Sequence, residues 1–409
     1  MKKELPDEWQ WKKLSDLYTD GKVIFQNGFA CGKNNQSGLG LSQLRPMNIN
    51  SSGKIDLTQV KFVEIAKDTA RYSLKKDDVI FNNTNSQELV GKTAVWDKEL
   101  QDSVLSNHMT IIRFSEDSGI LPRYLAKYLH SLWGKKYFEQ ICTNHVNQSS
   151  VGINRLKDIE FPLPPLETQH KIVAILENAE ETKKLRRQAD ELTQKLLQSV
   201  FLEMFGDPVI NSMNWDTKKL SKLCVKIYGG GTPSKSRPEY YEGNIPWVTP
   251  KDMKQDFIGD SIDHITEKAI GESSTKLIPP NSLLMVIRSG ILKKKLPVAI
   301  NTCEVTLNQD MKSFIFDNRL TDTSFMLYFF KIYQRELLNR VRSVTADNLE
   351  FDQIKDIDVI LPPIELQHRF SQIVEQVERT RSSQRQSSLE INNLLDALMQ
   401  KAFTGELVL

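Results

Sequence analysis

The chain has 409 residues, with 54 Lys and Arg against 52 Asp and Glu, so its formal net charge is +2. The composition, 39% hydrophobic and 26% charged, is that of a globular protein and excludes a disordered, collagen-like or fibrous chain. The length predicts two or three domains. We expect a cytoplasmic protein with no membrane association, because no apolar run approaches the roughly 20 residues of a membrane span and the first residues lack the apolar stretch of a signal peptide.

Residues 1–163 predict an irregular α+β domain. Short β-rich runs such as DVIFNN (78–83) and MTIIRF (109–114) alternate with segments rich in Gly, Asn and Pro. The string SQELVGKTAV (86–95) contains Gly-Lys-Thr, but a phosphate-binding loop needs glycine where this chain has Ser86. We therefore interpret this string as a turn that leads into a strand, not as a nucleotide site.

Residues 164–210 predict one long helix. Pro164 and Pro165 suit the first helical turn, Glu167 favours the positive end of the helix dipole, and Gly206 marks the stop. The uninterrupted stretch is roughly 38–40 residues, or about 55–60 Å at 1.5 Å per residue.

Residues 211–361 and 362–409 repeat this order as a second α+β domain and a second long helix. KDIEFPLPPLETQHKIVAILE (157–177) recurs as KDIDVILPPIELQHRFSQIVE (355–375), with 11 of 21 positions identical at an offset of 198 residues. LLQSVF (196–201) recurs as LMQKAF (398–403). The spacing from the Pro-Pro pair to this block is 32 steps in the first copy and 36 in the second, which predicts helices that differ by about one turn. A single repeat near 200 residues indicates a duplicated domain.

The two long helices are predicted to pair as an antiparallel coiled coil. Each has apolar heptad positions at both ends and polar ones between them, for example the KKLRR run at 183–187. The polar middle either sets the register of the pair or is solvated where the helices diverge. The alternative is two ordinary amphipathic helices, each packed on its own domain.

Catalytic and metal-binding motifs are absent from the sequence. The four cysteines are widely separated, and the six histidines include no HExxH or other ligand spacing, so we predict no metal site and no catalytic residues. Gln169, His170, Gln367 and His368 occupy equivalent places at the two helix starts. We interpret these four residues as packing or partner-binding groups.

Polar and basic loop residues are the candidates for DNA contact. Arg and Lys pair with guanine, Asn and Gln pair with adenine, and Lys and Ser/Thr contact phosphates. In the first domain the candidates are Asn34, Asn35, Gln36, Arg45, Asn82, Asn83, Asn85, Lys92, Gln148, Ser149 and Ser150. In the second domain they are Thr232, Ser234, Lys235, Arg237, Tyr240, Tyr241, Arg288, Lys293, Lys294 and Lys295. Each residue taken alone also fits a solvated loop, and domain charges of +3 (22 basic minus 19 acidic, 1–163) and +2 (21 minus 19, 211–361) require any DNA-binding patch to be local.

Over its whole length the chain resembles the specificity (S) subunits of type I restriction-modification systems. The resemblance is carried by the opening WQWKKLSDL (9–17), GGTPS (230–234), YYEGNIPWVTPKDM (240–253), LNQDMKSF (307–314) and the repeated LPP-x-E-x-Q block. It implies two target-recognition domains of mixed β-sheet and helices, related by a pseudo-two-fold duplication and separated by the two helices. Each domain is expected to read one half of an asymmetric, interrupted double-stranded DNA site.

The resemblance also implies partners and cofactors. Two methyltransferase (M) subunits dock on the helices, restriction (R) subunits join in some complexes, and S-adenosylmethionine, ATP and Mg belong to those partners. The chain itself is then non-catalytic and holds no cofactor. Two alternatives stay open, which are a non-catalytic coiled-coil scaffold with duplicated protein-binding heads and an enzyme without a local motif.

Overall fold

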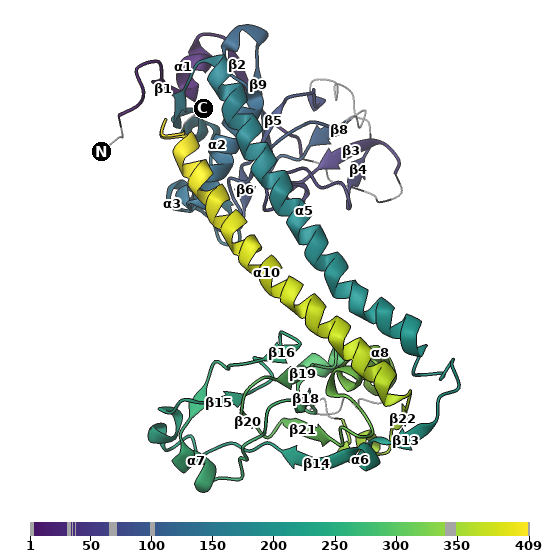
Figure 1. The fold of residues 1–409 in the computed structure, drawn as a ribbon. Helices are drawn as coiled ribbons and strands as arrows, with labels where there is room; N and C mark the ends of the chain where they lie inside the picture. Colours follow the sequence, from purple (N-terminus) through teal and green to yellow (C-terminus); the bar gives the residue numbers. More distant parts are fainter. Residues whose placement is uncertain are drawn as a thin grey trace. The chain divides into compact units, whose positions relative to one another are not determined.

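The structure, a computed structural model, describes residues 4–30, 34, 36, 38–64, 72–98, 103–339 and 349–407. The chain divides into two compact units. Unit 1 is Met1–Leu185 with Ser388–Leu409, and unit 2 is Arg186–Ser387. These units cut across the four segments expected from the sequence, because each unit takes part of both long helices (Figure 1).

Unit 1 is built on a central antiparallel sheet of order β2-β9-β5-β7, with a second sheet of order β4-β3-β8 and two smaller ones, β1-β12 and β10-β11-β6. Its strands are β1 (Gln10–Lys13), β2 (Val23–Asn27), β3 (Leu41–Leu44), β4 (Lys61–Val63), β5 (Val79–Asn82), β6 (Thr84–Asn85), β7 (Thr93–Val95), β8 (Ser103–Leu105), β9 (Met109–Phe114), β10 (Thr143–Asn144), β11 (Ser149–Ser150) and β12 (Glu160–Leu163). Its short helices are α1 (Leu14–Thr19), η1 (Pro46–Asn48), η3 (Glu116–Ser118), α2 (Pro122–Gly134), α3 (Tyr137–Ile141) and α4 (Ile153–Lys157).

Unit 2 repeats the strand order of the central sheet, the second sheet and the two-stranded sheet, and adds β16 at the edge of its central sheet. Its sheets have the orders β14-β21-β18-β19-β16, β17-β15-β20 and β13-β22. The strands are β13 (Thr217–Lys219), β14 (Cys224–Gly229), β15 (Ile245–Val248), β16 (Phe257–Ile258), β17 (His264–Ile265), β18 (Leu283–Val286), β19 (Val298–Asn301), β20 (Thr306–Leu307), β21 (Met311–Phe316) and β22 (Asp358–Ile360). The helices are α6 (Leu220–Leu223), η4 (Pro238–Tyr241), α7 (Glu267–Gly271), η5 (Gly290–Lys293), α8 (Thr323–Leu338) and α9 (Phe351–Lys355). The α+β class and the duplication expected from the sequence are thus confirmed.

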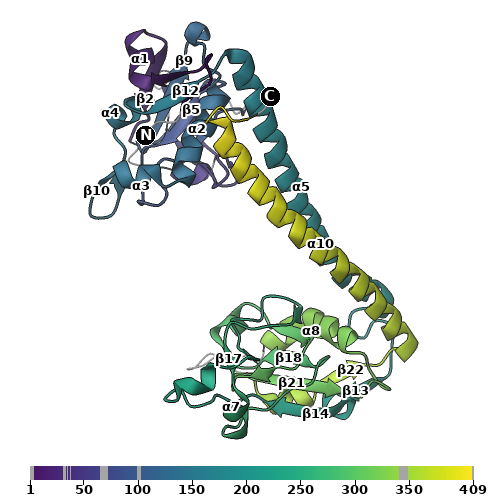
Figure 2. The same ribbon diagram turned by 60° about the vertical axis from the view of Figure 1, so that its left-hand side comes forward.

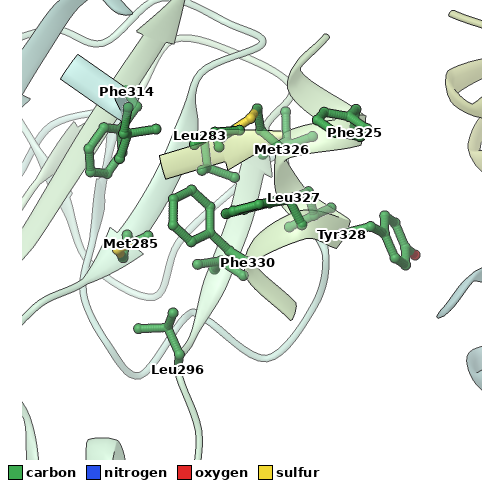
Figure 3. Packing of buried hydrophobic residues seen from close by; sticks show 14 of the residues in the cluster. Leu283, Met285, Leu296, Phe314, Phe325, Met326, Leu327, Tyr328 and Phe330 are labelled. Carbon is green, nitrogen blue, oxygen red and sulfur yellow. The ribbon is translucent and has the colours of Figure 1, made fainter. Parts of the chain in front are cut away.

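Helix α8 covers one face of the central sheet of unit 2 (Figure 2). The β18 run Leu283–Val286 is buried throughout, as a continuous apolar strand between two covered faces should be. In Figure 3, Leu283 and Phe314 of the sheet point toward Phe330 of α8, whereas Tyr328 points away from them. Tyr328 instead meets Phe370 of the long C-terminal helix, with ring centroids 5.4 Å apart.

The long helices are α5 (Leu166–Phe205) and α10 (Ile364–Ala402). In unit 2 their segments run antiparallel, because the end of α5 lies against the start of α10, where the rings of Phe201 and Phe205 meet Phe370 edge to face. The two helices have 40 and 39 residues, so the expected difference of one turn is wrong. Helix α5 continues past its copy of the repeated LLQSVF block until Gly206, whose φ of +76° suits a helix stop.

In the part of the chain that the structure describes, no helix is both long and apolar enough to cross a membrane.

Candidate nucleic-acid interface

Three loops of unit 2 emerge from one end of its central sheet. Strand β14 ends at Gly229, which pairs with Lys312 at the beginning of β21. Strand β18 ends at Val286 opposite Met311, and the next strand, β19, begins at Val298 opposite Met285. The loops at 230–237, 287–297 and 308–310 therefore lie together, and we call this place the loop end of the sheet. The topology brings together Thr232, Ser234, Lys235, Arg237, Arg288, Lys293, Lys294 and Lys295 of the predicted DNA-binding set.

The glycine-rich loop that follows β14 is held by close backbone contacts. A Cβ at Gly230 would lie 1.8 Å from the carbonyl oxygen of Asn308, so only glycine fits there. The Gly231 carbonyl accepts a hydrogen bond of 3.0 Å from Trp247 Nε1, and the Pro233 carbonyl accepts one of 2.8 Å from the hydroxyl of Tyr241. Thr232 is half-buried, whereas Ser234 and Lys235 are exposed on this anchored loop.

Arg237 and Tyr240 form a triad with Glu272. Arg237 donates to the Tyr240 hydroxyl at 2.6 Å and to Glu272 at 2.7 Å, while the hydroxyl donates to Glu272. That hydroxyl hydrogen bond is the main reason that the pKa of the Glu272 carboxyl is lowered. Tyr240 is only 3% exposed and its hydroxyl orients Arg237, so its contact with DNA stays a prediction. Tyr241 is half-buried and also serves the loop framework.

The remaining basic groups of this end are at the surface. Arg288 is exposed and donates to Asp310 at 2.6 Å, which partly neutralises its charge. Lys293, Lys294 and Lys295 are exposed on the turn that includes η5. The loop end of unit 2 thus presents several lysines, one of the residue types that contact phosphates.

The central sheet of unit 1 has the same loop end. Asn27, the last residue of β2, pairs with Thr110, and Asn82, the last of β5, pairs with Met109. The chain leaves the sheet there after Asn27 and after Asn82, and residues 106–108 precede β9 at the same end. The β10–β11 hairpin joins them because Ser149 and Ser150 of β11 pair with β6.

Two predicted DNA contacts of unit 1 are buried at this end. Asn82 is 0% exposed, and its Nδ2 donates to the Leu89 carbonyl at 3.0 Å. Lys92 is 7% exposed, its Nζ donates to the Ile49 carbonyl, and burial lowers the pKa of its ammonium group. The prediction is wrong for both residues, because a buried side chain with a backbone partner cannot reach DNA.

Asn83 and Ser149 are also part of the framework. Asn83 Nδ2 donates to Thr110 Oγ1 at 2.8 Å, and Thr110 donates to Asn27 Oδ1 at 2.7 Å, which joins three strand ends. Ser149 is buried and donates to Asn144 Oδ1 at 2.7 Å. The prediction that these two side chains contact DNA is wrong, because both are buried and bonded to other side chains of the unit.

The other predicted residues of unit 1 have different settings. Asn34, Gln36 and Gln148 are exposed, and Asn35 lies outside the described residues. Asn85 and Ser150 are half-buried in the three-stranded sheet that carries the hairpin. Arg45 is half-buried and donates to Gln43 Oε1 at 3.1 Å.

The predicted partner-binding residues separate into two kinds. Gln169 and Gln367 are 0% exposed, so the prediction that they bind a partner is wrong. Each instead binds backbone groups of its own unit. His170 and His368 are exposed in the first turns of α5 and α10, so their partner role stays a prediction.

Sequence reasoning missed His145, Val146 and Asn147, which form most of the hairpin tip and are all exposed. The sequence there is a run of mostly uncharged polar residues, which is common in turns. Nothing in that run indicates that these side chains are exposed.

A protein-family model described as the type I restriction modification DNA specificity domain matches residues 6–194 and 213–393. The chain is 36% identical over 221 residues to the EcoR124I/EcoR124II specificity subunit of Escherichia coli, which is 51% of either chain. It is 23% identical to the putative MjaX specificity subunit of Methanocaldococcus jannaschii over 99% of this chain and 95% of that one.

Solved structures share the fold. The S subunit from M. genitalium superposes with a TM-score of 0.59 at 13% identity, over 98% of this chain and 99% of that one. A chain from a structure on complex assembly and conformational transition of the type I R-M system gives a TM-score of 0.59 at 20% identity, over 99% of this chain and 100% of that one.

Proposed function

Because the chain belongs to the family of type I restriction-modification DNA specificity domains, we propose that it is the DNA sequence-specificity subunit of such a complex. Each unit reads one half of an interrupted DNA site. The observation that carries the proposal is the loop end that both central sheets share, reached through the same connectivity in each unit.

The two loop ends carry different chemistry, which supports an asymmetric site. Unit 2 presents Lys235 and the lysines at 293–295, whereas unit 1 presents the uncharged hairpin and the exposed amides of Asn34 and Gln36. Lysines contact phosphates and fix the register on the duplex, while amides pair with base edges. Two half-sites of different sequence follow from this difference.

The near-neutral charge of the chain supports a division of the phosphate contacts between this chain and its partner subunits. Affinity for DNA depends largely on the number of phosphates that are neutralised, and a net charge of +2 over 409 residues supplies little beyond local patches. The partner subunits therefore provide much of the phosphate contact.

Helices α5 and α10 set the distance between the half-sites and dock two methyltransferase subunits, with His170 and His368 among the contacts. S-adenosylmethionine, ATP and Mg belong to the methyltransferase and restriction subunits, and this chain is non-catalytic. Support comes from the family membership and from the length of both helices, about 60 Å at 1.5 Å per residue.

The proposal is tested by mapping methylated adenines in the DNA of cells that carry the candidate methyltransferase with and without this chain. The expected result is methylation at one interrupted, asymmetric motif that disappears when the chain is omitted. Binding of the purified complex to that motif should fall steeply as salt is raised.

Methylation that does not depend on the chain, together with failure to co-purify the two proteins, would contradict the proposal. In that case the duplicated units are better explained as protein-binding heads of a scaffold.

A further inference from the structure

The β10–β11 hairpin of unit 1 is a short, firmly closed ribbon. Thr143 pairs with Ser150 and Asn144 with Ser149, and His145 N donates to the Gln148 carbonyl at 2.7 Å across the turn. On its other side β11 pairs with β6, so the ribbon continues a sheet at the loop end.

Side-chain hydrogen bonds reinforce the base of this hairpin. Ser149 Oγ donates to Asn144 Oδ1, and the backbone N–H of Val151 donates to the Asn83 carbonyl at 2.9 Å. Asn83 is itself buried against Thr110. The tip is therefore carried on a rigid support, which lowers the conformational entropy lost when it binds.

The tip combines an apolar group with uncharged polar groups. Val146 is 99% exposed, the highest value among the large hydrophobic side chains described as exposed. His145, Asn147 and Gln148 beside it are exposed too, and no charged residue occurs from 143 to 150. Single exposed apolar residues are common on protein surfaces, so the inference depends on this combination.

From this combination we infer that the hairpin tip reads base edges in the DNA major groove, at an A·T pair of the half-site bound by unit 1. A two-stranded ribbon fits the major groove. The amides of Asn147 and Gln148 match the N6 and N7 atoms of adenine, and Val146 contacts the methyl group of thymine. The ribbon has no Lys or Arg with which to neutralise the charge of a phosphate. The inference rests on the proposed function.

The test compares the full chain, co-purified with its methyltransferase, as wild type and as Val146→Ala, Asn147→Ala and Gln148→Ala. Methylated adenines are mapped, and binding is measured on the mapped site and on duplexes with one A·T pair changed to G·C. We expect the Asn147 and Gln148 variants to lose discrimination at one or two adjacent positions of one half-site, by about 5-fold to about 150-fold, the range for a good bidentate base contact. Val146→Ala, which removes an apolar contact only, should lose less at the same place.

Val225→Ala is the matched control, because Val225 is 70% exposed and lies on β14 of unit 2. It should leave both half-sites unchanged, and all four variants should keep the wild-type unfolding midpoint. An unchanged motif in every hairpin variant overturns the inference, and so does a uniform loss of methylation at all sites. If wild type directs no methylation to a bipartite motif, the proposed function itself fails, which is a different result.

Discussion

Gln367 of α10 ties the start of this helix to the start of α8. Its Oε1 accepts from the backbone N–H of Asp322 and from the hydroxyl of Thr321, both at 3.0 Å, and its Nε2 donates to the Pro362 carbonyl at 2.8 Å. In unit 1, Gln169 likewise accepts from the N–H of Leu121, the residue that precedes α2. The repeated LPP-x-E-x-Q block is thus a structural joint, because its glutamine satisfies backbone groups that are buried with it.

We predict that Gln367→Ala lowers the free energy of unfolding of unit 2 by about 3 kcal/mol, since buried donors and acceptors lose their partners. Urea unfolding followed through Trp215 and Trp247, the tryptophans of unit 2, measures this change. The neighbouring His368→Ala is the control and should change stability by less than about 0.5 kcal/mol, because His368 is exposed. If both variants lowered the free energy of unfolding equally, Gln367 would not act as a structural joint.

Asp256 is the centre of a charged cluster that fixes α10 to unit 2. It pairs with Lys331 of α8 and with Arg381 of α10 at 3.2 Å, and the Tyr328 hydroxyl donates to it at 3.3 Å. Glu378 also pairs with Arg381. Burial raises the pKa of the Asp256 carboxyl, but the two cations more than offset this, so the pKa lies below 3.8.

This direction predicts acid sensitivity. A carboxyl whose pKa is lower in the folded state stabilises that state above its unfolded pKa, and the contribution is lost as the pH falls through the folded value. Asp256→Asn should therefore destabilise unit 2 by about 3 kcal/mol at pH 7, and its difference from wild type should shrink below about pH 3.8. Urea titrations at several pH values measure both effects.

The exposed pair of Lys219 and Asp358 provides the matched control. Asp358→Asn should cost less than about 1 kcal/mol at pH 7, as surface pairs do. A pH-independent defect of Asp256→Asn would show that lost packing, not charge, explains it.

Among the elements, the end of α10 belongs to the unit that begins the chain. Phe403, just beyond α10, is 5% exposed and lies with its ring centroid 5.5 Å from Tyr124 and 5.2 Å from Tyr128 of α2. Its counterpart in the repeat, Phe201, packs on Phe325 of α8 in unit 2. Each long helix thus ends in the core of the unit that it did not start from.

Phe403→Ala should lower the stability of unit 1 by about 3–5 kcal/mol, the range for removing a buried aromatic ring, and leave unit 2 unchanged. Hydrogen exchange of the two units, measured separately by peptide, detects this difference. Leu394→Ala, at a position of α10 that is 55% exposed, is the control with little expected effect. If Phe403→Ala lowered the protection from hydrogen exchange in unit 2 and not in unit 1, Phe403 would not belong to the core of unit 1.

The sequence was sufficient for the features that depend on local signals. The duplication and the α+β class follow from repeated letters, and the helix starts predicted at Pro164 and Pro362 from the backbone chemistry of proline lie two residues before the observed ones. The burial of Lys92 could not be predicted, because it depends on the carbonyl of Ile49, far away in the sequence. Nor could the exposure of Val146, since a valine between polar residues has the same pattern in a buried strand.

At the scale of the whole molecule, the proposed function makes the spacing between half-sites depend on both long helices. We predict that four residues inserted after Leu185 and four after Ser387, where the compact units divide, lengthen each helix by about 6 Å. The preferred DNA spacer should then grow by nearly two base pairs at about 3.4 Å each, with both half-sites unchanged, in a map of methylated adenines. Leu185→Ala is the control, because it changes the residue at the insertion point, which is 56% exposed, without changing the length of the helix. This variant should methylate sites with the original spacer. An insertion variant that folds yet methylates only at the original spacing would show that the helices do not set the distance.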